Sequence, residues 1–278
     1  MNFQNNNIGI IGCGHLGISL AKSFLVNKII KENNLSLSCR GSKASLARIH
    51  DENLSHRLLS NKEVAKRSDI LILAVKPQDI FELSNLEYKE NTFVLSFIAG
   101  ISEISLKRVL GANNIVRGII SGPDTIMEEK AVVAVSQSCN EAIINLFKPL
   151  AKLFYLLPEK HIDLVSSLVT LPGLLLLIDS KNRSGEVAAA ISEIEKVYYS
   201  KYLNPRDLYH WACQLKPSFY SSTKLASYLS AMATKGGVTE AVMNEFMKGG
   251  SIFSAITSGA DRSRQIADEV NTLIESTT

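Results

Sequence analysis

A short apolar run near the amino terminus leads directly into a glycine-rich turn, and this junction limits the folds open to the chain. The run is residues 8–11, and an apolar stretch with helical character, residues 18–25, follows the turn. Gly12, Gly14 and Gly17 have the spacing G-x-G-x-x-G. At a strand-to-helix junction these glycines allow a tight turn, close approach of a pyrophosphate and close helix packing. The pattern therefore predicts a dinucleotide site with the diphosphate at the helix N-terminus, the alternative being a purely structural turn.

Strand and helix signals alternate through the first half of the chain. Residues 69–75 form an almost continuous apolar run, which is typical of a parallel strand buried on both faces. Further strands are expected at residues 35–39, 92–97, 114–120, 131–135 and 154–157, and helices from the glycine turn to about residue 30 and at 44–49, 62–67 and 141–153. Strands separated by helices predict an α/β fold with a doubly wound parallel sheet of the Rossmann type.

The character of the chain changes after about residue 158, where strand signals nearly vanish. Helices are expected at residues 162–180, 185–202, 205–213, 218–232, 239–247 and 252–274. The expected domains are therefore a dinucleotide-binding domain over residues 1–158 and an all-helical dimerisation domain over residues 159–278. Because helical domains with much apolar surface often pack on a twin, we expect a homodimer or higher homo-oligomer.

Composition argues against several other classes of protein. The net charge of +3 and the scattered basic residues predict no nucleic-acid groove. The four cysteines form no C-x-x-C pair and the five histidines show no ligand spacing, so no metal is expected. Separate cysteines also favour a reducing, cytoplasmic location. We expect no signal peptide, and the most apolar window, residues 164–178, is broken by Pro172-Gly173 and predicts a buried helix, with no membrane contact.

Three further segments lie where a dinucleotide would need them. The expected second strand ends without an acid and offers Arg40, Ser42 and Lys43 instead. An acid there would bind the adenine ribose of NAD(H), whereas a cation and a hydroxyl suit a 2′-phosphate, so we predict NADP(H) over NAD(H). A solvated turn is the alternative role for these residues. The other segments, Ala74-Val75-Lys76-Pro77 and residues 96–100, follow two central strands at the sheet edge where ligands bind.

These motifs, taken together and in order, resemble those of the pyrroline-5-carboxylate reductase family. The matching segments are residues 8–17, 74–77, 96–100 and 115–117 in the first half, and Thr234–Ala241, Ala255, Arg262 and Ser263 in the second. The loop at residues 234–239 resembles the family's Ser-Pro-Gly-Gly-x-Thr motif. The resemblance covers nearly the whole chain. It implies that this chain is an NADP-dependent oxidoreductase of proline biosynthesis, which reduces 1-pyrroline-5-carboxylate to proline by hydride transfer.

The resemblance also implies roles for individual residues. Backbone amides of Gly236, Gly237 and Val238 would hold the substrate carboxylate, because a Gly-Gly turn at a helix start offers N–H donors without steric hindrance. The hydroxyl of Thr239 would reach the ring nitrogen as the catalytic group, and Thr170 would contact the substrate. A plain helix N-cap is the alternative role for Thr239. Besides the glycines and Arg40 and Ser42, the implied cofactor contacts are His15, Leu16, Ala74, Val75, Lys76, Pro77, Ala99 and Ser121.

Several departures from the family pattern leave other functions open. Ser121-Gly122 replaces an Asn-Thr pair that normally lies near the nicotinamide, Leu168-Val169 replaces small residues, and Lys235 replaces a proline. Branched side chains at residues 168–169 are expected to narrow or reshape the substrate pocket. The alternatives are therefore an oxidoreductase of the same fold with a different imine or keto substrate, and a dinucleotide-binding regulatory protein without catalysis.

Overall fold

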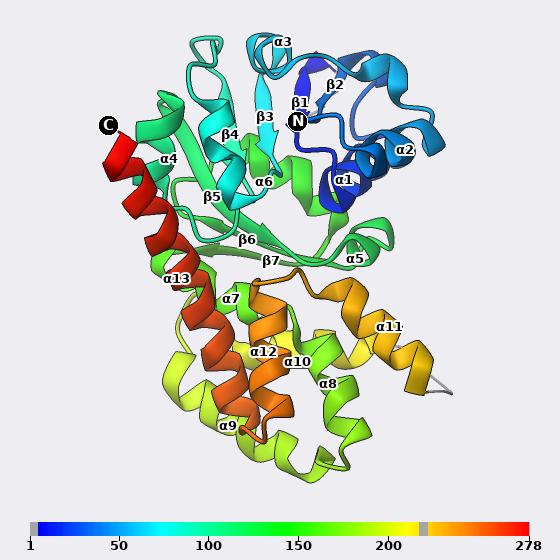
Figure 1. Cartoon of the computed structure of the whole chain (residues 1–278), viewed down its shortest axis with the longest axis vertical. Helices are drawn as coiled ribbons and strands as arrows, with labels where there is room; N and C mark the ends of the chain where they lie inside the picture. The colour runs from blue at the N-terminus through cyan, green and yellow to red at the C-terminus, as the bar shows by residue number, and fades with distance from the viewer. Residues whose placement is uncertain (1–4, 217–221, 278) are drawn as a thin grey trace. The chain divides into compact units, whose positions relative to one another are not determined.

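The computed structural model describes residues 5–216 and 222–277, whose helices and strands are drawn in Figure 1. Contacts divide the chain into two units, Met1–Glu159 with Ile266–Thr278, and Lys160–Gln265. The first contains the sheet and the second is helical among its described residues. Helix α13, Ile252–Thr277, begins in the helical unit, and its last turns belong to the sheet unit.

A seven-stranded sheet forms the centre of the first unit, in the order β2-β1-β3-β4-β5-β6-β7. The strands are β1 Ile8–Ile11, β2 Leu35–Ser38, β3 Ile70–Leu73, β4 Phe93–Ser96, β5 Asn114–Ile120, β6 Ala131–Ser136 and β7 Ala151–Leu157. The first five strands of this order are parallel to one another. The sheet and the helical region that follows it confirm the predicted fold class (Figure 1).

One part of the sheet differs from the expected parallel arrangement. Strand β6 runs antiparallel to β5, and β7 is parallel to β6. Only residues 121–130 connect β5 to β6, and they contain the short helix α5, Pro123–Met127. A parallel crossover needs a dozen or more residues, so the chain returns antiparallel at this edge.

Alternate residues of the central strands pack on opposite faces of the sheet. Ile10 and Ile72 lie in one apolar cluster with Phe24 of helix α1, whereas Leu71 lies in a second cluster with Val270 from the end of α13. Because both faces are covered, these strands are apolar almost throughout. The other helices of this unit are α1 His15–Val26, α2 Lys43–Asp51, α3 Asn61–Arg67, α4 Glu103–Leu110 and α6 Glu141–Phe147.

Helix α6 is shorter than the sequence pattern predicts. It ends at Phe147, a 3-10 turn containing Pro149 follows, and β7 begins at Ala151. Proline lacks the N–H that a helix interior needs, and its ring clashes with the carbonyl four residues earlier. The apolar residues that continue the pattern after Pro149 therefore belong to the last strand.

The second unit consists of helices in its described part. They are α7 Ile162–Leu168, α8 Leu171–Ser180, α9 Val187–Tyr198, α10 Pro205–Leu215, α11 Ser222–Met232, α12 Val238–Met247 and the start of α13 (Figure 1). Each expected helix has a counterpart, but the one predicted over residues 162–180 is divided into α7 and α8 at residues 169–170. Residues 218–221 of another prediction lie outside the described residues. The stretch Glu159–Ser180 is long and apolar enough to cross a membrane by length and composition, with a hydropathy of 1.8, but 89% of that window is buried inside the protein.

Candidate functional site

Gly12 makes the turn after β1 possible. Its φ of +105° lies in the left-handed region, and a Cβ at this position would lie 2.5 Å from the carbonyl carbon of Ala74. Its N–H donates to the Ser38 carbonyl at 2.9 Å. The turn is therefore fixed between the carboxyl ends of β2 and β3, and only glycine fits without strain.

Gly14 and Gly17 have different surroundings in the same turn. A Cβ on Gly17 would meet the Gly12 carbonyl oxygen at 2.1 Å, so glycine allows α1 to pack on the turn. A Cβ on Gly14 would meet nothing within 4 Å. Helix α1 begins with no side-chain cap and no acid in its first turn. Its first N–H groups, from His15 and Leu16 onward, therefore lie free at the positive end of the helix dipole, next to open space. An anion site requires this arrangement.

Arg40 lies just after β2, as expected, but it already has partners. Its Nη1 lies 2.8 Å from Asp79 Oδ1 and 3.2 Å from Glu82 Oε1. The Asp79 side chain is only 10% exposed, whereas that of Arg40 is 57% exposed. The sequence has no acid at the end of β2, but the fold brings Asp79 of the 3-10 helix Pro77–Leu83 to that place, where it pairs with Arg40.

Ser42 has a structural role in this turn. Its hydroxyl accepts the Ser45 N–H at 3.2 Å as the N-cap of α2, and it also donates to Ser45 Oγ at 3.0 Å. Lys43 is exposed at the first position of that helix. A phosphate beside this turn would therefore meet the Arg40 guanidinium and the Lys43 ammonium more directly than the Ser42 hydroxyl.

The other predicted cofactor segments follow β3, β4 and β5. Ala74 and Val75 are half-buried against the glycine turn, Lys76 is exposed, and Pro77 starts the 3-10 helix. Ala99 is half-buried beside Gly100, whose φ is +78°. These segments lie at the carboxyl ends of parallel strands, the edge at which such sheets bind ligands.

Ser121, a predicted cofactor contact, has its hydroxyl engaged in hydrogen bonds within the fold. It is 1% exposed, and its hydroxyl accepts the Val132 N–H at 2.9 Å and lies 2.5 Å from the Thr125 hydroxyl. These contacts close the connection between β5 and β6. The hydroxyl is therefore occupied by the fold.

Cys13, inside the glycine turn, is an apolar core residue. It is 1% exposed, and burial raises the pKa of its thiol to about 12. Because the thiolate is the reactive form, this cysteine is chemically inert at neutral pH.

The glycine loop of the helical unit lies at the start of α12. Gly236 has a φ of +72°, its N–H donates to Glu240 Oε2 at 2.6 Å, and its carbonyl accepts Arg262 Nε at 2.8 Å. The N–H of Gly237 donates to the Thr234 carbonyl at 2.8 Å. Both predicted glycine donors thus have acceptors already.

The donors left for a ligand at this loop come from the first turn of α12. This helix begins at Val238 with no side-chain cap, so the amides of Val238 and Thr239 have no acceptor among the described residues. The half-buried hydroxyl of Thr239 forms no hydrogen bond within the described chain either. Thr239 is therefore not the N-cap, which is Gly237.

Thr170 lies at the junction of α7 and α8 and is 3% exposed. Its hydroxyl donates to the Ser167 carbonyl at 2.7 Å. Leu168 beside it is fully buried and Val169 is half-buried. This segment forms part of the core of the helical unit, and the Thr170 hydroxyl is used within its own turn.

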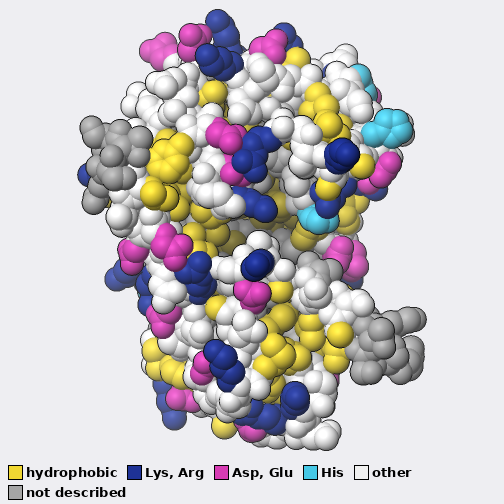
Figure 2. Space-filling model, viewed as in Figure 1, with side chains coloured by type: hydrophobic (Ala, Val, Ile, Leu, Met, Phe, Trp, Pro, Cys, Tyr) yellow, Lys and Arg dark blue, Asp and Glu magenta, His cyan; other side chains and the backbone are white. Residues whose placement is uncertain are grey.

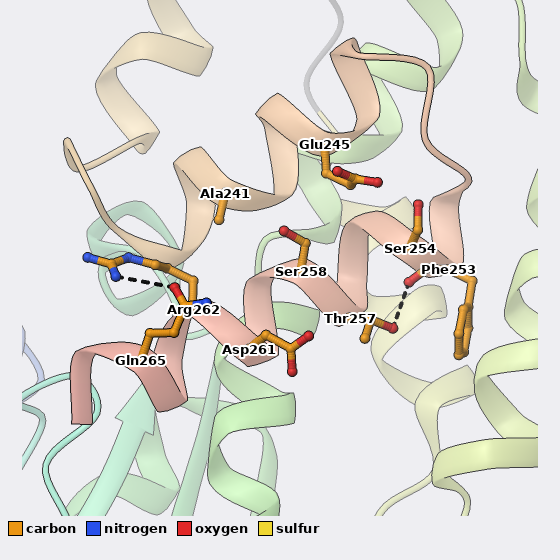
Figure 3. A pocket seen from close by; sticks show the side chains of 9 residues that line it. All are labelled: Ala241, Glu245, Phe253, Ser254, Thr257, Ser258, Asp261, Arg262 and Gln265. Carbon is orange, nitrogen blue, oxygen red and sulfur yellow. Dashed lines mark hydrogen bonds between the residues drawn. The ribbon is translucent and has the colours of Figure 1, made fainter. Parts of the chain in front are cut away.

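A groove of about 460 Å³ lies between α12 and α13 in the helical unit. In Figure 3, Ser258 of α13 points toward α12, which contributes Ala241 and Glu245 to the lining. Asp261 and Arg262 of α13 also line the groove. Since Arg262 also holds the Gly236 carbonyl, this groove adjoins the glycine loop.

Three residues near these sites escaped the sequence analysis: Asp79, Glu240 and Asp261. The helical spacing of residues 254, 258, 261 and 265 on one face was the available signal for the groove. Nothing local could reveal that Asp79 meets Arg40. Among residues 5–216 and 222–277, no three His, Cys, Asp or Glu side chains gather as metal ligands would.

Comparison with known proteins agrees with this arrangement. A family model described as NADP oxidoreductase coenzyme F420-dependent matches residues 7–100, the segment that contains the glycine turn. The pyrroline-5-carboxylate reductase of Arabidopsis thaliana is 24% identical over 286 residues, covering 94% of this chain and 95% of that protein.

Solved structures show the same fold. The 1-pyrroline-5-carboxylate reductase of Streptococcus pyogenes matches with a TM-score of 0.58 and 20% identity, over 93% of this chain and 98% of that one. The pyrroline carboxylate reductase of Plasmodium falciparum, solved with NADP bound, matches with a TM-score of 0.56 and 17% identity, over 95% and 99%.

Proposed function

Because this chain is a divergent member of the pyrroline-5-carboxylate reductase family, we propose that it reduces 1-pyrroline-5-carboxylate to proline with a hydride from NADPH. The family and the sheet support the general assignment, an oxidoreductase that uses a nicotinamide dinucleotide. The substrate and the preference for NADP(H) are the proposed part.

The open helix start at Gly14 is the observation that carries the proposal. A Cβ on Gly12 or Gly17 would clash with nearby backbone, whereas a Cβ on Gly14 would point into open space in front of uncapped N–H groups. This combination fits a diphosphate that approaches the backbone closely. The nicotinamide supplies the hydride when the cofactor is bound.

The proposed preference for NADPH depends on Arg40. Asp79 and Glu82 both contact Nη1, which leaves the edge formed by Nε and Nη2 without a partner among the described residues. Arginine binds phosphate through such an edge in a bidentate manner. Exposed Lys43 adds a second positive charge at the same turn.

The substrate would be held by the start of α12. Open amides of Val238 and Thr239 at the positive end of this helix suit the substrate carboxylate. Glu240 shows that this loop accepts a carboxylate, since its own side chain occupies the Gly236 N–H at 2.6 Å. The substrate would gain the Gly236 N–H only if the Glu240 side chain turned away.

Thr239 would act on the imine. Its hydroxyl, which has no partner within the described chain, would donate a hydrogen bond to the ring nitrogen. That bond draws electron density from the C=N carbon and favours hydride addition there. The high pKa of an aliphatic alcohol makes Thr239 a polarising group, so the proton that completes the amine comes from solvent.

A second candidate is an oxidoreductase of the same fold with a different imine or keto substrate. Two observations favour it: Leu168 is fully buried where the family has a small residue, and the Ser121 hydroxyl closes the β5–β6 connection where the family has an asparagine. A dinucleotide-binding protein without catalysis is the third possibility from the sequence.

The proposal includes a homo-oligomer assembled through the helical unit and a cytoplasmic location. All four cysteines, Cys13, Cys39, Cys139 and Cys213, are free, which fits a reducing compartment.

The test is NADPH consumption by the purified protein with 1-pyrroline-5-carboxylate, alongside NADPH and NADH binding without substrate. Turnover to proline supports the proposal. Binding without turnover on this substrate, but with turnover on other cyclic imines or keto acids, transfers the support to the second candidate. If neither dinucleotide binds, the glycine turn is structural and the whole proposal is wrong.

A further inference from the structure

A cavity of about 430 Å³ lies in the sheet unit, away from the glycine turn. Its lining includes Asn7, which precedes β1, Leu35, which begins β2, and Arg67, which ends α3 just before β3. These are the amino ends of three neighbouring parallel strands, whereas Gly12 follows the carboxyl end of β1. The cavity therefore lies at the sheet edge opposite the candidate dinucleotide site.

All the ionisable side chains that line this cavity are basic. They are His56, Arg57, Lys66, Arg67 and Lys89. Four of them have a carboxylate neighbour from outside the lining. His56 Nε2 and Arg57 Nη2 both approach Glu32 Oε1, at 3.0 and 3.2 Å, Lys66 Nζ lies 3.4 Å from Glu87 Oε2, and Lys89 Nζ lies 2.7 Å from Asp69 Oδ1. The exposed Arg67 forms no ion pair or hydrogen bond with a described residue, and only the through-space interaction with Glu63 on the same helix opposes its charge.

Arg57 adds an independent observation. Its side chain is only 17% exposed, and Nη2 donates to Asn33 Oδ1 at 3.0 Å. Its buried Nε has no hydrogen-bond partner. A buried donor without an acceptor costs free energy, and because Arg57 belongs to the cavity lining, a turn of its side chain would bring Nε to an acceptor in the cavity.

We propose that this cavity binds a small phosphorylated molecule. Once the Arg57 side chain turns toward the cavity, a phosphate oxygen supplies the acceptor that its Nε lacks. The other oxygens meet Arg67 and Lys66, because guanidinium and ammonium groups bind phosphate through charge-assisted hydrogen bonds. The cavity is several times larger than a phosphate ion, and the side-chain amide of Asn7 among its lining suits a hydroxyl group of an attached polyol.

Calorimetric titration of the protein with inorganic phosphate and with glycerol 3-phosphate, in the presence and absence of saturating NADPH, tests this proposal. We expect one binding event that persists with NADPH present, and tighter binding of glycerol 3-phosphate than of phosphate. The variants R67Q and K66Q change exposed side chains, so the fold is retained. Each should weaken binding roughly fivefold, as loss of one charged hydrogen-bonding group does.

The variant K62Q is the matched control. Lys62 is an exposed cation on the same helix, but it does not line the cavity, so K62Q should bind phosphate as the wild type does. No measurable binding, equal losses in K62Q and R67Q, or complete competition by NADPH would each overturn the proposal. Equal affinity for inorganic phosphate and glycerol 3-phosphate would overturn the polyol part of the proposal and identify free phosphate as the ligand. Failure to bind NADPH would count against the proposed function alone, since the phosphate titration does not require it.

Discussion

Gly12 and Gly14 lie two residues apart in one turn, yet the structure constrains them for different reasons. At Gly12 both the positive φ and the Ala74 backbone exclude a side chain. At Gly14 the φ of −74° is ordinary and the Cβ position is empty. The first glycine is therefore a requirement of folding, whereas the second is a requirement of whatever binds in front of it.

We predict opposite effects of alanine at these two positions. G12A should lower the free energy of unfolding by about 3 kcal/mol, because backbone strain adds to a steric clash. G14A should cost less than ~1 kcal/mol but weaken NADPH binding roughly tenfold, because a methyl group holds the diphosphate away from the amides. Urea denaturation and a fluorescence titration measure the two effects. Normal NADPH affinity in G14A would contradict the assignment.

Arg40 is held by acids that the sequence places far from it. Its contact with Asp79 joins the end of β2 to the 3-10 helix after β3. A charge reversal at Arg40 would bring a third carboxylate beside Asp79 and Glu82. The resulting repulsion would destabilise the fold, so a loss of cofactor affinity could not be separated from a loss of stability. Replacement by glutamine is therefore the cleaner change.

For R40Q we predict a roughly tenfold loss of NADPH affinity with little change for NADH, because only NADPH carries the 2′-phosphate. Parallel titrations with both dinucleotides provide the measurement. An equal loss for the two would remove Arg40 from cofactor selection.

The variant D79N separates positioning from charge. It makes the site more positive but releases the guanidinium, so weaker NADPH binding would show that Asp79 positions Arg40. Tighter NADPH binding would show instead that Asp79 opposes the phosphate. E82Q removes the more exposed of the two acids and serves as its control, with NADPH affinity expected to stay within about twofold.

At the scale of elements, helix α12 combines an uncapped start with a glycine loop tied to α13. Arg262 holds the Gly236 carbonyl, and the Thr239 hydroxyl has no partner in the described chain. A hydroxyl without an intramolecular bond contributes little to stability, so its removal tests function almost alone.

For T239A we predict at least a tenfold loss of turnover with NADPH affinity unchanged and a stability change below ~0.5 kcal/mol. T239S keeps the hydroxyl and should restore most of the rate. Steady-state kinetics with thermal unfolding as a stability control make the comparison. If both variants turn over at the wild-type rate, Thr239 lies outside the catalytic site.

At the scale of the whole molecule, the proposed oligomer depends on the helical unit. Val197, Tyr199 and Met247 in this unit are 57%, 66% and 54% exposed. Large apolar side chains that are exposed in one chain are candidates for burial against a second copy.

We predict that light scattering after size-exclusion chromatography will give at least twice the 30.5 kDa of one chain. Y199E should shift the protein toward the monomer, since a buried unpaired charge opposes association. V26E is the matched control, because Val26 is 63% exposed but belongs to the sheet unit. A monomeric wild type, or equal effects of both variants, would contradict assembly through the helical unit.

The sequence by itself determined the elements of this protein. Apolar periodicity and glycine spacing are local properties, so they predicted the strands, the helices of both halves and the turn at residues 12–17. They also predicted which segments end at the ligand-binding edge, because that follows from parallel strands. The predicted helix at 141–153 was too long because a longer apolar pattern outweighed the local effect of Pro149.

Only the tertiary structure decided which groups in those segments remain available. Asp79 reaches Arg40, Glu240 occupies the Gly236 amide, and Val132 occupies the Ser121 hydroxyl. The direction of β6 and the basic cavity at the opposite sheet edge were decided at the same level. These features depend on how the segments meet in space, and hydrogen bonds and ion pairs form between whichever groups the fold brings within about 3 Å.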